Sequence, residues 1–254
     1  MKYKPLTLSI IIPVFNEEDY LEDCLESIAG QTIAPNEVIV VDNNSTDDSL
    51  KIAEKYGFVR VVGERRQGIV FARDKGFNIA NSDLLGRIDA DTVLAADWVE
   101  KVLSSYQDNQ NGQDFALSGK SYYRNLKIFG KSTIVIDVFY YLFSRLALGH
   151  HTLFGSNMVV PKSAWDEVKS YVCTDDKYHE DIDLAVHLAK SLKIVKSNNI
   201  ASGVASRIND KPGGLAIYIL RWIDTIRHGW RVNSLDQYSF VLQIKNLFMQ
   251  KINQ

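Results

Sequence analysis

Two aspartates separated by one small residue, Asp89-Ala90-Asp91, form the segment of this 254-residue sequence best suited to holding a metal ion. They follow residues 83–88, a mainly apolar segment that predicts a strand, so both carboxylates would stand in the turn at its end. Oxygen ligands of this kind suit Mg²⁺ or Mn²⁺, which usually keep open positions for substrate phosphates. The alternative is a solvated turn with two surface acids, and the triplet alone does not decide between the two.

A second acidic position, Asp42, ends the apolar segment 37–41. Its carboxylate is suited to accept a hydrogen bond from an N–H group of a nucleotide base. Residues 43–47 are Asn, Asn, Ser, Thr and Asp, types that also favour the start of a helix. Out of context, an ordinary helix start is the simpler interpretation of Asp42.

A third acidic position, Glu180-Asp181, opens a helical pattern at 181–192 in which leucines recur every four residues. A group-transfer enzyme must remove a proton from the attacking hydroxyl, and a carboxylate here is suited to act as that general base. Acidic residues also stabilise the first turn of a helix through its dipole, so a capping role is the alternative.

The elements that would position these residues alternate between strand and helix over the first 90 residues. Strands are predicted at 8–14, 37–41, 59–62 and 83–88, with helices at 20–29, 45–56 and 68–80. Right-handed crossovers then give an open parallel sheet with helices on both faces, and such sheets bind ligands beyond the carboxyl ends of their strands. The acidic positions 42 and 89–91 lie at such ends.

The second half of the chain is less regular. Strands are predicted at 115–123 and 158–160, and helices at 134–148, 181–192, 215–230 and 240–252. The sequence contains no internal repeat or low-complexity segment that would indicate a separate architecture.

Composition limits the partners. The formal net charge is −2, so the chain lacks the basic surplus typical of nucleic-acid binding, and we expect no nucleic-acid partner. Cys24 and Cys173 fit no metal-ligand spacing. The apolar start at 6–14 contains Pro13 and lacks a small-residue cleavage site, and no uncharged apolar stretch reaches roughly 18 residues. We therefore expect a cytoplasmic protein.

Six motifs, taken in order, resemble those of the family 2 (GT-A fold) inverting glycosyltransferases. They are residues 9–17 (SIIIPVFNE), 40–47 (VVDNNSTD), 68–76 (GIVFARDKG), 89–91 (DAD), 155–158 (GSNM) and 180–184 (EDIDL). Two positions depart from the family pattern. Asn43 replaces a common acidic residue, which leaves the base contact to Asp42, and Asp74 replaces a common Asn.

This resemblance implies an α/β protein with the GT-A (Rossmann-like) fold, an open, mostly parallel sheet flanked by helices with a helical C-terminal extension. Residues 1–200 would form the catalytic domain, divided into a nucleotide-sugar half at about 1–105 and an acceptor half at about 106–200. Residues 201–254 would form the helical extension packed on it.

The resemblance also implies a donor site. The residues contacting the nucleotide-sugar would be Pro13, Phe15, Glu17, Asp42, Arg73, Asp89 and Ala90. Arg73 would approach the diphosphate or organise the loop beside it. Asp91, together with Asp89, would ligate Mn²⁺ or Mg²⁺.

On the acceptor side, the resemblance implies roles for Gly155 and Asn157 in the loop that receives the acceptor. Asp181 would be the catalytic base, and Glu180 would support it. The implied reaction is a single in-line displacement at the anomeric carbon, in which positioning and stabilisation of the leaving diphosphate supply most of the rate.

The function implied is transfer of a sugar from a nucleoside-diphosphate sugar, with a UDP-sugar favoured, to an acceptor hydroxyl with inversion. A glycan or lipid-linked acceptor in cell-surface polysaccharide or glycolipid synthesis would be the partner. Three alternatives stay open: a polyprenyl-phosphate glycosyltransferase using a GDP- or UDP-sugar, a nucleotidyltransferase, and a non-catalytic nucleotide-binding protein. Against the nucleotidyltransferase, residues 15–17 replace its usual glycine-rich loop with a basic residue.

The aromatic segment 134–148 permits two interpretations. It is either a core helix under the acceptor loop or an amphipathic surface helix at a membrane edge. The predicted helix 215–230 and the residue after it carry Arg221, Arg227 and Arg231 beside two tryptophans, a pattern suited to a membrane interface or an acceptor phosphate. A peripheral position on the inner face of the cytoplasmic membrane is therefore also expected.

Overall fold

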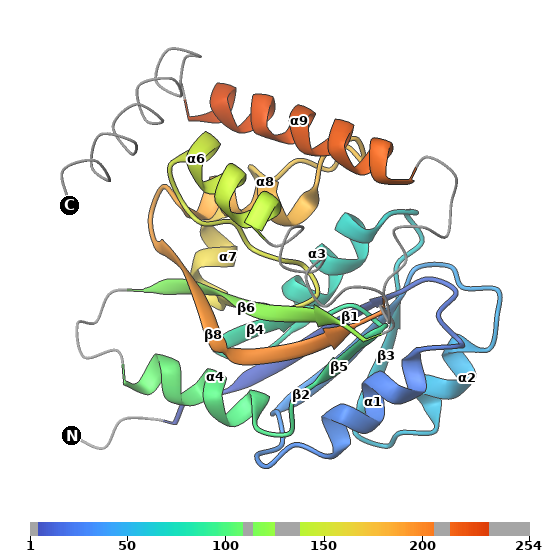
Figure 1. Cartoon of the computed structure of the whole chain (residues 1–254). Helices are drawn as coiled ribbons and strands as arrows, with labels where there is room; N and C mark the ends of the chain where they lie inside the picture. Colours follow the sequence, from blue (N-terminus) through green and yellow to red (C-terminus); the bar gives the residue numbers. More distant parts are fainter. Residues whose placement is uncertain (1–4, 109–113, 125–137, 206–213, 234–254) are drawn as a thin grey trace.

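Strand β1 (Leu8–Val14) lies inside the sheet, and all of its residues are buried. A continuous run of apolar, β-branched residues is stable in this position when helices cover both faces of the sheet. The computed structural model describes residues 5–108, 114–124, 138–205 and 214–233, and in these ranges helices lie on both sides of the sheet (Figure 1). The α/β class expected from the sequence is confirmed.

The sheet has eight strands in the order β3-β2-β1-β4-β7-β6-β8-β5. The other strands are β2 (Glu37–Asp42), β3 (Val59–Gly63), β4 (Leu84–Arg87), β5 (Thr92–Leu94), β6 (Phe115–Tyr123), β7 (Met158–Pro161) and β8 (Lys193–Val204). Strands β3, β2, β1 and β4 are mutually parallel, as expected. Strand β7 runs antiparallel to β4 and β6, and β5 runs antiparallel to β8.

The helices form two layers against the sheet. They are α1 (Leu21–Ala29), α2 (Ser49–Glu54), α3 (Ile69–Ile79), α4 (Trp98–Gln107), α7 (Lys162–Val168) and α8 (Glu180–Leu188). Helices α1, α2 and α4 bury their apolar faces against one side of the sheet, where Ile10 and Ile12 of β1 point. Helices α3, α7 and α8 cover the other side with Ile11.

A third layer lies on α8 (Figure 1). It consists of the π-helical turn η1 (Val138–Phe143), helix α6 (Ser144–Leu148) and helix α9 (Gly214–Val232). Tyr141, Leu148 and Ile226 from this layer share a buried cluster with Ile182 and Val186 of α8. Among the residues described, no helix combines the length and the apolar character needed to cross a bilayer.

Several sequence predictions need correction. The helix predicted at 134–148 is a π-helical turn followed by α6, and residues 134–137 lie outside the described ranges. The helix predicted at 181–192 ends at Leu188. Leu192 is buried in the same core, so the apolar spacing continues beyond the helix itself. The predicted helix 240–252 also lies outside the described ranges.

Four elements were missed by the sequence analysis: α4, α7 and the strands β5 and β8. Strand β5 is only three residues long, too short for a period to be visible. Strand β8 pairs with β6 at 193–197 and again at 201–204, and its residues at 193–199 alternate between exposed and buried only in part. Tertiary pairing rather than local pattern therefore defines these strands.

Helix α3 lies so close to the sheet that Gly76 has no room for a side chain. A Cβ atom there would lie 2.4 Å from Cγ2 of Ile11 and 3.1 Å from Cγ2 of Val41. We predict that Gly76→Ala lowers the free energy of unfolding by about 1–3 kcal/mol, because overpacking outweighs the gain of about 1 kcal/mol in helix propensity. Denaturant unfolding measures this, with Gly57→Ala as control because an added Cβ there meets nothing within 4 Å. Equal stability of the two variants would contradict the prediction.

Candidate active site

The polar turns after β1, β2 and β4 lie at one edge of the sheet. Val14 at the end of β1 is in register with Asp42, and the amide of Ile88 donates to the carbonyl of Ile11. In the sheet, β2 lies on one side of β1 and β4 lies on the other, so the strand order reverses at β1. The turns therefore flank a topological switch point. Ligands of open α/β sheets bind at such points.

The turns after β1 and β2 are joined to each other by hydrogen bonds. The amide of Asn16 donates to Oγ of Ser45 (3.1 Å), and Oδ1 of Asn16 accepts from the amide of Thr46 (2.8 Å). Asn16 and Asn44 both have positive φ, 55° and 67°, a conformation that asparagine tolerates better than most residues. The two turns therefore form one structural unit beside the exposed ring of Phe15.

Asn43 connects this unit to the loop before α3. Its side chain is buried, and its Nδ2 donates to the carbonyls of Glu64 (2.9 Å) and Arg66 (2.7 Å). Its Oδ1 accepts from the amide of Gly68 (2.7 Å). An amide makes both kinds of contact, whereas a carboxylate only accepts. The departure noted in the sequence at this position thus has a structural use, and the half-buried Asp42 beside it accepts from the amide of Ser45.

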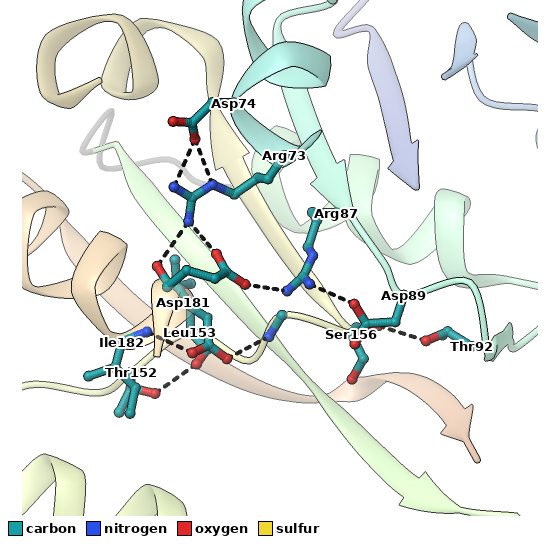
Figure 2. Close-up of polar contacts among 12 residues, drawn as sticks. Arg73, Asp74, Arg87, Asp89, Thr92, Thr152, Leu153, Ser156, Asp181 and Ile182 are labelled. Atoms are coloured by element: carbon teal, nitrogen blue, oxygen red, sulfur yellow. Dashed lines mark hydrogen bonds and ion pairs between the residues drawn. The ribbon is translucent and has the colours of Figure 1, made fainter. Parts of the chain in front are cut away.

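Two buried arginines connect the acidic residues of the site (Figure 2). Arg73 on α3 pairs with Asp74 (2.8 Å) and with the carboxylate of Glu180 at the start of α8. Arg87 at the end of β4 pairs with Glu180 (2.9 Å) and with Asp89 (2.6 Å). The result is a chain of alternating charges running from Asp74 through Glu180 to Asp89, and the exposed fractions of the two arginine side chains are only 0% and 2%.

The pKa values of two adjacent carboxyls, Glu180 and Asp181, are shifted in opposite directions. Burial alone would raise the pKa of Glu180, but the guanidinium groups of Arg87 and Arg73 outweigh it and hold that pKa below the ordinary value. Burial and the neighbouring negative charge of Glu180 raise the pKa of Asp181. Glu180 is therefore held ionised, and Asp181 is the better proton acceptor of the pair.

The Asp89-Ala90-Asp91 turn begins with the last member of this chain of charges. The amide of Thr92 donates to the carbonyl of Asp89 (3.0 Å) and closes the turn. The Asp89 side chain is 34% exposed and Asp91 is 7% exposed, while Ala90 is buried in the core. Ala90 was expected to contact the donor. Because its side chain is buried in the core, only its backbone is available for that contact.

The loop at 155–157 links Asp181 to the same turn. The amide of Gly155 donates to Oδ2 of Asp181 (2.9 Å), and Oγ1 of Thr92 lies 3.5 Å from the carbonyl of Ser156 (Figure 2). A Cβ atom on Gly155 would lie 1.4 Å from Nη1 of Arg87, so only glycine leaves the arginine in place.

Asn157 was expected on the acceptor side, and the structure places its side chain in the interior. It is fully buried, its Oδ1 accepts from Nε1 of Trp98 (2.9 Å), and its Nδ2 donates to the carbonyls of Lys120 and Ile200. These contacts hold the loop against β6 and β8. Arg73 is also fully buried, which fits the loop-organising role among the two considered for it.

Arg87 is the main site residue that sequence reasoning missed. The signal was present, because an arginine interrupts the otherwise apolar segment 84–88. Charged residues are almost never fully buried unless they are paired. An arginine inside a predicted buried strand therefore indicates buried acidic partners, but their identity depends on the fold.

Comparison with known families gives one match over most of the chain. The family model described as "Glycosyl transferase family 2" matches residues 9–168. Among curated relatives, a putative glycosyltransferase, EpsH, of Bacillus subtilis is 33% identical over 40% of this chain and 30% of its own length. A cholesterol galactosyltransferase of Borreliella burgdorferi is 25% identical over 78% of this chain and 59% of its own length. The chain thus covers less than two thirds of the length of these relatives.

Solved structures share the fold. The TarS protein of S. aureus in complex with UDP-GlcNAc has a TM-score of 0.61 at 22% identity, covering 80% of this chain and 59% of that one. The mannosyltransferase PcManGT of Pyrobaculum calidifontis, in complex with GDP-Man and Mn²⁺, has a TM-score of 0.62 at 19% identity, covering 87% and 61%. At these identities the likeness establishes the architecture alone.

Removing Arg87 should be far more costly than removing an exposed arginine. We predict that Arg87→Met lowers the free energy of unfolding by about 3–5 kcal/mol, because Glu180 and Asp89 lose their shared partner. Arg60→Met is the control: Arg60 pairs with Glu37, its side chain is 51% exposed, and its loss should cost less than about 1 kcal/mol. Denaturant unfolding of both variants tests this, and similar losses would show that the charge chain does not matter for stability.

Proposed function

The chain belongs to glycosyl transferase family 2, and from this membership we propose that it transfers a sugar from a nucleoside-diphosphate sugar to an acceptor hydroxyl with inversion of the anomeric carbon. The observation that carries the proposal is the chain of charges that ties Glu180-Asp181 to Asp89. It brings the proposed carboxylate base and the acidic turn together from segments about ninety residues apart in the sequence. Family membership also favours sugar transfer over nucleotidyl transfer.

In the proposed donor site, the joined turns after β1 and β2 receive the nucleotide. Phe15 exposes 48% of its surface beside Pro13 and Glu17, which suits contact with a base and ribose. The carboxylate of Asp42 is proposed to accept a hydrogen bond from the base. A UDP-sugar is the favoured donor. Among the fold neighbours, TarS binds UDP-GlcNAc and PcManGT binds GDP-Man, so the shared architecture is found with either nucleotide.

The donor set at Asp89 and Asp91 fits Mn²⁺ or Mg²⁺. Both residues offer hard carboxylate oxygens in a single turn, and two carboxylates with substrate phosphates make a typical site for these ions. When bound, the ion would neutralise charge on the departing diphosphate. Nη2 of Arg87 donates to Oδ1 of Asp89 (2.6 Å), and this contact is proposed to orient the turn toward the donor.

On the acceptor side, Asp181 is proposed to take the proton from the attacking hydroxyl. Its Oδ1 and Oδ2 accept backbone N–H groups of Ile182 (2.8 Å) and Gly155 (2.9 Å), which orient the carboxylate. Glu180 is a positioning residue, because its carboxylate contacts Arg73 and Arg87. A glycan or lipid-linked acceptor in cell-envelope synthesis is the proposed partner, and a polyprenyl phosphate is the alternative.

Peripheral contact with the inner face of the cytoplasmic membrane is part of the proposal. The outer face of α9 exposes Ile217 (54%) and Leu220 (61%) next to Arg221, a combination suited to an anionic lipid surface. We expect co-sedimentation with anionic vesicles that weakens when Ile217 and Leu220 are both changed to Ser. Equal sedimentation of wild type and variant would exclude this face.

Thermal unfolding with UDP, GDP and dTDP, each with and without Mn²⁺, tests the donor site. We predict that UDP raises the Tm in a Mn²⁺-dependent manner and that Asp91→Ala removes this dependence, because a ligand carboxylate is lost. Asp108→Ala, at an exposed position at the end of α4, is the control and should behave as wild type. The absence of a shift with every nucleotide would contradict the proposal. If one nucleotide does raise the Tm, a hydrolysis screen of nucleotide-sugars identifies the donor.

Asp181→Asn should keep nucleotide binding and lose transfer by at least about 100-fold, because the amide keeps the shape but cannot accept the proton. Asp176→Asn, at an exposed position shortly before it, should keep full activity. Substantial transfer by Asp181→Asn would show that another group is the base.

The wild-type pH profile gives a second readout. The base must be deprotonated, and the pKa of Asp181 is raised by burial and by Glu180, so kcat/KM should begin to fall at a pH above the ordinary aspartate value of 3.8. Glu180→Gln removes that negative charge and should move the acid limb to lower pH. A limb that stays in place would contradict the assignment of this limb to Asp181.

A further inference from the structure

A cluster of metal-type ligands lies outside the proposed active site, between α8 and α9. Asp183, His187 and His228 each offer one ligand atom, and these three atoms all lie within 4.8 Å of one another. Asp183 and His187 are four residues apart on α8 and so share one face of that helix. His228 comes from α9, which packs against α8.

The separations between these ligand atoms are close to those between two ligands of a single ion. Oδ1 of Asp183 lies 3.2 Å from Nε2 of His228 and 3.8 Å from Nε2 of His187. Around a tetrahedral ion with ligand atoms about 2.1 Å away, these atoms are roughly 3.4 Å apart. The three side chains therefore need only small shifts to coordinate one ion.

Burial makes the cluster unusual as a purely protein contact. The exposed fractions of Asp183 and His187 are 1% and 7%, and among the described residues Oδ1 of Asp183 and Nε2 of His187 have no hydrogen-bond partner. Leaving such buried polar groups unsatisfied is energetically unfavourable. An ion pair between Asp183 and a protonated His228 would satisfy the carboxylate but leave His187 without a partner.

The surroundings hold the ligands in place. Oδ2 of Asp183 accepts from the amide of Cys173 (2.7 Å), which turns Oδ1 toward the imidazoles. The ring of Tyr178 stacks on His228 with centroids 4.5 Å apart. Such supporting contacts orient the ligands of metal sites.

We propose that Asp183, His187 and His228 bind one divalent transition-metal ion, with Zn²⁺ the best match, and that this ion fastens α9 to α8. Two imidazoles and one carboxylate suit Zn²⁺, whereas Mg²⁺ and Ca²⁺ prefer oxygen ligands throughout. The side chain of His228 is 23% exposed, so water can reach the remaining coordination position from that side. Because α8 begins at Glu180-Asp181, the ion would stabilise the helix that carries the proposed base.

Zinc titration of the tag-free, chelator-treated chain tests this proposal. The titration is done in an Asp91→Ala background, so that the acidic turn after β4 does not bind zinc as well. We expect one Zn²⁺ per chain by calorimetry and elemental analysis, together with a rise in Tm. Co²⁺ should give the visible absorption bands of a nitrogen- and oxygen-ligated ion.

His228→Ala and His187→Ala should each weaken Zn²⁺ binding by at least about 100-fold and remove the rise in Tm. Arg227→Ala is the matched control, because Arg227 precedes His228 on α9 and its side chain is 63% exposed. Circular dichroism of the metal-free variants checks that they fold, and having two variants keeps the test valid if one of them does not. Unchanged Zn²⁺ affinity in both histidine variants, or no stoichiometric binding to the chain with all three ligands, would overturn the proposal.

Discussion

The candidate site depends on one electrostatic constraint, the need to neutralise two arginines buried between the sheet and α8. Arg73 and Arg87 have almost no contact with water, and Glu180 lies between them. Two charges of this kind are costly to bury unless their partners are held in good geometry. Satisfying them fixes the start of α8 against α3 and the end of β4. The positions of Asp89 and Asp181 follow from that arrangement.

The site combines two halves that are built differently. In the first half, parallel strands deliver their turns to one edge. The side chain of Asn16 accepts from the amide of Thr46 and so joins the turns after β1 and β2, and the side chain of Asn43 donates to the carbonyl of Glu64 in the loop before α3. In the second half, β7 enters the sheet antiparallel to β4 and brings Gly155 against Arg87. The glycine leaves space for the guanidinium and donates its amide to Asp181. The loop at 155–157 is therefore fitted to the charge chain.

The third layer adds a further dependence. Helix α9 contacts α8 through an apolar cluster and through the Asp183, His187 and His228 group. The same helix exposes Ile217 and Leu220 on its opposite face. One helix thus connects the outer surface of the protein to the helix that carries Glu180-Asp181.

Local sequence determined the elements of the first 90 residues. The apolar segments at 8–14 and 38–41 are buried on both faces, which their composition alone indicates, and the polar residues at their ends are placed by the parallel sheet. Order along the chain was also sufficient to predict that the turns after the first, second and fourth strands share an edge. Only the tertiary structure decided the partners of Arg73 and Arg87, the interior position of Asn157 and the pairing of β5 with β8. These contacts join residues far apart in sequence, and a side chain's pairing energy depends on which charges the fold brings within a few ångströms.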